Sequence, residues 1–116
     1  MKDAAAARAL CLRHIAGAIQ RIRSYTAAGK KAFLADPMLQ DAVIRNLEIV
    51  GEAVRRLDEK SKHARPEVPW REIAGMRDRL IHGYFDVNLE IVWATVKKDL
   101  PALTAAVTAL QRRNIP

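Results

Sequence analysis

Apolar residues that recur with helical spacing are the feature of this sequence that most constrains its fold. In the first 25 residues they stand at Leu12, Ile15, Ile19 and Ile22. Steps of three and four residues place all of them on one face of an α-helix. Similar stripes occupy most of the remaining chain, and no stretch shows the alternation that is typical of a half-buried strand. The pattern therefore predicts an all-α protein.

Proline, glycine and capping residues divide the stripes into four predicted helices, at about 4–25, 37–60, 69–83 and 88–113. Asp36 followed by Pro37 is typical of a helix start, and Asn88 can cap the last helix. Gly83 can end the third helix, and we expect Pro101 to kink or split the fourth. Four amphipathic helices with short connections predict an antiparallel four-helix bundle, formed by a single domain over residues 1–116.

The charge of the chain points to an anionic partner. Lys and Arg number 20 against 13 Asp and Glu, which gives a net charge of +7, and the pI is about 10.1. Nucleic acid is the first candidate for such a partner.

The single cysteine, Cys11, cannot form an internal disulfide, which fits a reducing cytoplasm. No stretch approaches the roughly 18 apolar residues of a membrane span, and no zinc pattern or glycine-rich phosphate loop occurs, so we expect neither metal nor cofactor.

The segment from Arg77 to Tyr84 concentrates the groups that can do chemistry. It holds Arg77, Asp78, Arg79, His82 and Tyr84 within eight residues. Imidazole can take or give a proton near neutral pH, and arginine can hold a phosphate with two hydrogen bonds. Together they suit RNA cleavage, in which a base removes the proton of the 2′-hydroxyl and that oxygen attacks the adjacent phosphorus. The nucleophile is already tethered beside the phosphate, so the reaction needs no metal.

Spacing along a helix supports part of this arrangement. Asp78 and His82 are four residues apart and share a face, so Asp78 can fix the imidazole tautomer. Arg77 lies about 140° around the helix from His82, whereas Arg79 is closer. Helix geometry alone therefore favours Arg79 for the phosphate.

The pattern Arg77-x4-His82-x-Tyr84 resembles the motif of HepT toxins, a branch of the HEPN ribonuclease superfamily. Residues 42–57 and 68–103 and the first helix resemble that family as well. The resemblance implies an all-helical homodimer that cleaves RNA without metal at a cleft between subunits. It also implies a type II toxin–antitoxin pair with an MntA-like nucleotidyltransferase antitoxin that transfers AMP to the motif tyrosine.

Carried onto this chain, the resemblance makes Arg77 the residue that stabilises phosphate, with Arg79 as the alternative. It makes His82 the acid–base group and Tyr84 the site of AMP transfer. Many members have Asn where this chain has Asp78, which leaves the role of that carboxylate open. A homodimer would also supply a second acid–base group. Each chain offers one motif histidine, and the reaction works best with a separate base and acid.

Two alternatives to a ribonuclease toxin remain: a non-catalytic HEPN-type module that binds RNA or nucleotide, and a helical protein that binds an acidic partner. We expect His14 and His63 to face solvent, and Trp70 and Trp93 to pack in the interior. Glu52 and Arg56 have the spacing of an ion pair within a helix. The pairs Arg55-Arg56 and Arg112-Arg113 are interpreted as solvated helix faces, with an RNA track as the alternative.

Overall fold

A computed structural model describes residues 2–82 and 87–113, and within these ranges the chain forms helices and no strand. The elements are α1 (Lys2–Tyr25), α2 (Lys30–Ala35), α3 (Pro37–Arg56), α4 (Glu59–Ala64), α5 (Trp70–His82) and α6 (Leu89–Arg113). The predicted all-α class is therefore confirmed.

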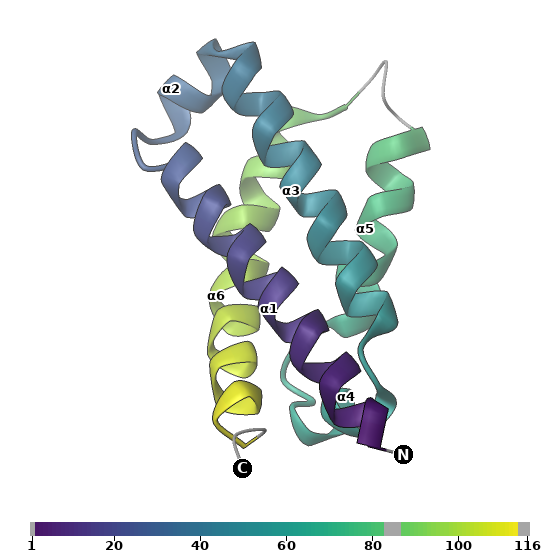
Figure 1. Ribbon diagram of the computed structural model, residues 1–116. Coiled ribbons are helices and arrows are strands. Elements are labelled where there is room, and N and C mark those ends of the chain that lie inside the picture. Colours follow the sequence, from purple (N-terminus) through teal and green to yellow (C-terminus); the bar gives the residue numbers. More distant parts are fainter. Residues whose placement is uncertain (1, 83–86, 114–116) are drawn as a thin grey trace.

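The four long helices run alternately up and down along a molecule measuring 46 × 27 × 23 Å (Figure 1). Helix α3 packs against both α1 and α5, and α1 also packs against α6. The short helix α2 lies at the end of the bundle where α3 begins, and α4 lies at the end where α3 finishes. This is the antiparallel bundle that the stripes predicted, with α3 between the helix of the motif and the first helix.

The core forms along the predicted stripes. The largest side chains with less than 2% exposure include Phe33, Leu12, Ile15, Ile22, Leu47, Ile73 and Leu103. Trp70 is buried as expected, and Trp93 packs with its ring centroid 5.5 Å from that of Phe33. Burying one such aliphatic or aromatic side chain contributes about 1.5–3 kcal/mol, so the helices are held mainly by this shared interior.

Two predicted helix starts are confirmed by their caps. The Asp36 carboxylate accepts a hydrogen bond from the Met38 backbone N–H at 2.9 Å, and Pro37 occupies the first helical position. The Asn88 side-chain oxygen accepts from the Glu90 N–H at 2.9 Å and the Ile91 N–H at 3.2 Å. Each cap satisfies N–H groups that have no partner inside the helix.

The structure corrects the prediction at three places. Helix α3 ends at Arg56 rather than near residue 60, and the separate helix α4 occupies part of the predicted break. Helix α2 was not predicted, because six residues are too few to show an apolar period. Pro101 was expected to kink or split the last helix, and α6 continues through it unsplit from Leu89 to Arg113. Pro101 and Lys97, whose carbonyl loses its partner, are both exposed, so water can satisfy that carbonyl.

Within the described residues, no helix combines the length and the apolarity that crossing a bilayer requires.

Candidate active site

Helix α5 carries most of the predicted motif. It continues as a regular helix from Trp70 to His82, so the positions of Arg77, Asp78, Arg79 and His82 lie on its last turns. Among these, the structure describes the side chain of Asp78. Tyr84 lies outside the described residues, as do the side chains of both motif arginines and of His82. The roles assigned to these residues therefore stay predictions.

Asp78 contacts a residue that the motif alone did not indicate. The Arg55 guanidinium, from α3, lies 3.4 Å from the Asp78 carboxylate through Nη2 and Oδ2. The same nitrogen donates a hydrogen bond to the Ala74 carbonyl at 3.3 Å. Both charged side chains are about half exposed, so this contact is worth at most about 1 kcal/mol. Arg55 is thus directed toward α5 rather than standing on a purely solvated face.

A groove of about 600 Å³ opens beside this contact, between the end of α3, α4 and the first turns of α5. We call it the basic groove; its charged and aromatic lining residues are Arg55, Glu59, Lys62, His63, Trp70 and Arg71. Three cations and one carboxylate line it, and Asp78, which contacts Arg55, adds a second carboxylate beside it, so one positive charge remains in excess next to the motif helix. Such a surface attracts anions.

The walls of the basic groove are held by contacts between its elements. The Trp70 indole N–H donates to the carbonyls of Lys62 at 3.1 Å and Arg65 at 2.9 Å, which fastens α4 and the following turn to α5. The Lys62 ammonium lies 3.7 Å from the Glu59 carboxylate, one turn away on α4. Trp70 thereby forms a fixed floor under the charged rim.

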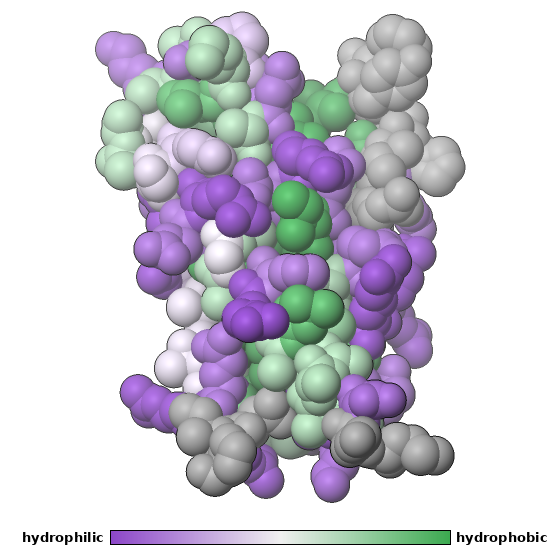
Figure 2. All heavy atoms as spheres, in the orientation of Figure 1, coloured by the Kyte–Doolittle hydropathy of each residue, from purple (hydrophilic) through white to green (hydrophobic). Residues whose placement is uncertain are grey.

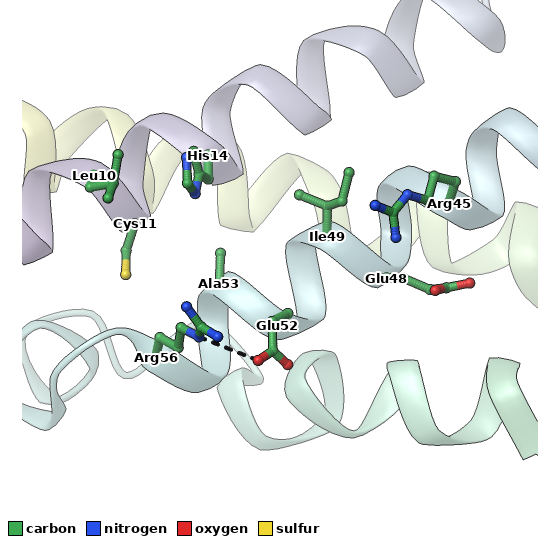
Figure 3. Close-up of a pocket in the computed structure, with 9 residues that line it drawn as sticks. All are labelled: Leu10, Cys11, His14, Arg45, Glu48, Ile49, Glu52, Ala53 and Arg56. Carbon is green, nitrogen blue, oxygen red and sulfur yellow. Dashed lines mark hydrogen bonds and ion pairs between the residues drawn. The ribbon is translucent and has the colours of Figure 1, made fainter.

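A second groove, of about 330 Å³, lies on the other side of α3, against α1. We call it the neutral groove. Its charged residues are Arg45, Glu48, Glu52 and Arg56, around a floor that includes Leu10, Cys11, Ile49 and Ala53 (Figure 3). The predicted ion pair is present, with Arg56 Nε 3.3 Å from the Glu52 carboxylate. Figure 2 shows hydrophobic areas enclosed by hydrophilic side chains along the junction of α1 and α3. Two cations and two carboxylates give this groove no preference for anions.

The remaining histidines behave as expected. His14 borders the neutral groove and His63 the basic groove, and both are exposed. His63 lies in α4, which occupies part of the predicted break between the second and third helices. In the described part of the chain, no three His, Cys, Asp or Glu side chains come together in a way that could hold a metal ion.

A carboxylate at the start of α4 has a shifted pKa. The Arg8 guanidinium, on α1, donates two hydrogen bonds to Asp58 Oδ2, at 2.8 and 3.1 Å. These bonds lower the pKa of Asp58 below its ordinary value, against a smaller opposing effect of burial. The pair fastens one end of α4 to α1 and so helps to fix a wall of the basic groove.

The comparison with known proteins identifies the family. The model of the family described as Ribonuclease HepT-like matches residues 15–110. That range is more than half of the chain, and the chain belongs to the ribonuclease HepT-like family. The family assignment agrees with the prediction of a ribonuclease.

Curated relatives extend the similarity across most of the chain. "Probable ribonuclease HepT" of Thermococcus cleftensis is 45% identical over 102 residues, which cover 87% of this chain and 93% of the relative. A "Putative RNase" of Caldanaerobacter subterraneus is 47% identical over 81 residues, which cover 70% of this chain and 72% of the relative. No solved structure matches the chain.

Proposed function

We propose that this protein is a metal-independent endoribonuclease and the toxin of a type II toxin–antitoxin pair. One observation carries the proposal: a chain of the ribonuclease HepT-like family holds the pattern Arg77-x4-His82-x-Tyr84, with its arginine and histidine on the last turns of α5. The relatives whose names describe an RNase support the reaction class. The single cysteine is consistent with action in the cytoplasm, where RNA substrates are present.

The proposed reaction uses the 2′-hydroxyl of the substrate as the nucleophile. His82 removes the hydroxyl proton, the oxygen forms a bond to the adjacent phosphorus, and the bond from phosphorus to the 5′-oxygen breaks. The leaving oxygen takes a proton, and the products are a 2′,3′-cyclic phosphate and a 5′-hydroxyl. Arg77, or Arg79 in its place, stabilises the charge that builds on the phosphoryl oxygens. DNA lacks the nucleophile and should not be cleaved.

A homodimer completes the acid–base chemistry. Each chain supplies one motif histidine, and two-fold symmetry would bring a second one to the same cleft. One imidazole can then act as the base while the other supplies the proton to the leaving oxygen. A monomer produced by interface substitutions should cleave RNA very poorly. Full activity from such a monomer would contradict this part of the proposal.

The proposed regulation is transfer of AMP to Tyr84 by an MntA-like nucleotidyltransferase antitoxin. The phenol oxygen would attack the α-phosphorus of ATP, and pyrophosphate would leave. The added group carries negative charge and volume, so it would repel and block RNA at a basic cleft. Incubation with the antitoxin and ATP should raise the mass by whole AMP units, and Tyr84→Phe should prevent this. Equal modification and silencing of the Tyr84→Phe protein would refute the assignment.

The direct test of the enzyme is His82→Ala, with His14→Ala as the matched control. Removing an acid–base group typically costs 10²–10⁴-fold in rate, so His82→Ala should nearly abolish RNA cleavage while the helical circular dichroism spectrum is retained. His14→Ala removes an exposed imidazole beside the neutral groove and should change the rate by less than about twofold. Cleavage should also persist in EDTA. If the His82→Ala protein is as active as the parent, the proposed mechanism is wrong, and a non-catalytic RNA-binding module becomes the better interpretation.

A further inference from the structure

The basic groove lies on the same face of α5 as the motif histidine. The positions of Arg71, Gly75, Asp78 and His82 follow one another at steps of four, three and four residues on one continuous helix. At about 100° per residue, these four positions fall within a band of about 60°. From Arg71 to His82 the helix rises about 16 Å. A strand bound at the position of His82 and continuing along this face would enter the groove.

The charges of the groove suit a chain of phosphates. The Lys62 side chain is 15% exposed, and its ammonium lies 3.7 Å from the carboxylate of Glu59, whose side chain is 77% exposed. Arg55 is held against α5 by the Ala74 carbonyl and the Asp78 carboxylate. Among the residues that the structure describes, exposed Arg71 makes no ion pair. Its guanidinium therefore remains able to hold a phosphate with two hydrogen bonds.

Gly75 provides space in the same groove. A glycine inside a helix is about 1 kcal/mol less favourable than alanine, and packing can explain such a residue where a neighbour would clash with a side chain. At Gly75 an added Cβ would meet no atom within 4 Å. Because Gly75 also lines the groove, the missing side chain leaves the backbone of α5 open to an incoming ligand.

We propose that the basic groove is an RNA-binding subsite that holds backbone phosphates on one side of the cleaved bond. Arg55, Lys62 and Arg71 supply its charge, and Gly75 gives the strand access to α5. The inference rests on the proposed ribonuclease function, which it extends by assigning a path to the substrate. The subsite recognises phosphates and not bases, so it increases affinity for long RNA without selecting sequence.

A charge reversal at Arg71 tests the subsite, with Arg13→Glu on α1 as the matched control. Both arginines are exposed, so both variants should fold. With His82→Ala present to keep RNA intact, Arg71→Glu should weaken binding of a fluorescent single-stranded RNA of about 20 nucleotides by fivefold or more. Arg13→Glu should change it by less than about twofold.

Gly75→Leu tests the space rather than the charge. Leucine is a better helix former than glycine, and the position has room for a side chain, so the variant should be at least as stable as the parent. Its side chain should occupy the groove and weaken binding of the long RNA while the net charge stays the same. Unchanged affinity in Gly75→Leu would overturn the proposed path of the strand along α5.

The outcomes separate the subsite from the enzyme. If the parent cleaves RNA and Arg71→Glu behaves like Arg13→Glu, the subsite is refuted and the ribonuclease stands. If the parent cleaves nothing but binds RNA in a manner that depends on Arg71, the enzyme is refuted and the groove stands as an RNA-binding site. If the protein binds no RNA, both proposals are wrong.

Discussion

Helix α3 separates two grooves that differ in charge although they draw on adjacent residues. Arg55 enters the basic groove and contacts α5, whereas Arg56 borders the neutral groove and pairs with Glu52 on its own helix. The cause is geometric, because consecutive residues point about 100° apart around a helix. Two cations and two carboxylates line the neutral groove, whereas three cations and one carboxylate line the basic groove, with Asp78 beside it in contact with Arg55. Net charge alone therefore does not indicate where a surface attracts anions, whereas a local surplus of cations does.

The salt dependence of RNA affinity, measured by fluorescence anisotropy in the His82→Ala protein, tests whether the basic groove binds phosphates. If Arg55, Lys62 and Arg71 each contact a phosphate, the slope of log affinity against log salt should be about −2 from these residues alone. Affinity should then fall about 20-fold between 50 and 200 mM salt.

Two arginine substitutions, one in each groove, show which groove contributes to the salt dependence of RNA affinity. Arg71→Gln should make the slope shallower by about 0.7, the contribution of one phosphate contact to a single strand. Arg56→Gln removes the same charge from the neutral groove and should leave the slope unchanged. Equal changes from both substitutions would show that the two grooves do not differ in the way proposed.

The substitution Trp70→Phe tests whether the floor of the basic groove is what holds α4 in place. It leaves the Lys62 and Arg65 carbonyls without their indole donor. We expect the free energy of unfolding to fall by about 1–2 kcal/mol, measured by urea denaturation followed by circular dichroism. Trp93→Phe is the control: within the described residues its indole donates no hydrogen bond, so the loss should be smaller. An equal loss in both variants would mean that ring volume, and not the two hydrogen bonds, is responsible.

The sequence predicts the parts of this molecule that depend on local chemistry. Asp36 and Asn88 start helices because their side chains cap N–H groups two or three residues away. Such a contact can be predicted from the sequence because the residues that make it are close together in the chain. The apolar stripe of α3 predicts its buried face for the same reason. Helix α4 could not be predicted, because the residues that hold its ends lie outside it. Arg8 is far earlier in the chain, and Trp70 belongs to the next helix.

The candidate site also combines features that the sequence predicts with contacts between distant residues that it does not predict. The positions of Arg77, Asp78, Arg79 and His82 on one helix follow from local periodicity, and α5 has the extent that this requires. The contact between Arg55 and Asp78 joins residues 23 positions apart, so it depends on how α3 packs against α5. Asn46 is a second example from the neutral side. Asn46 is buried and accepts a hydrogen bond from Arg21 Nε at 2.7 Å, a contact that depends on how α1 packs against α3.

The smallest expected effect comes from Asp58→Asn, which tests whether the tie between α4 and α1 supports the basic groove. Arg8 lowers the pKa of folded Asp58 below its ordinary value of 3.8. A lowered pKa stabilises the folded state above pH 3.8, and that stabilisation is lost as pH falls through the lower folded value. The pair is partly exposed, so the parent should exceed the variant in free energy of unfolding by only about 0.5 kcal/mol at pH 7.

Urea denaturation at pH 7 and in steps from pH 5 to 3 measures this difference directly. All other carboxylates are common to the two proteins, so the difference between them isolates Asp58. It should be constant above about pH 5 and should shrink toward zero below pH 3.8, where the parent carboxyl becomes protonated. A difference that stayed constant to pH 3 would mean that the charge of Asp58 does not hold α4, and the wall of the basic groove would then depend on the contacts of Trp70.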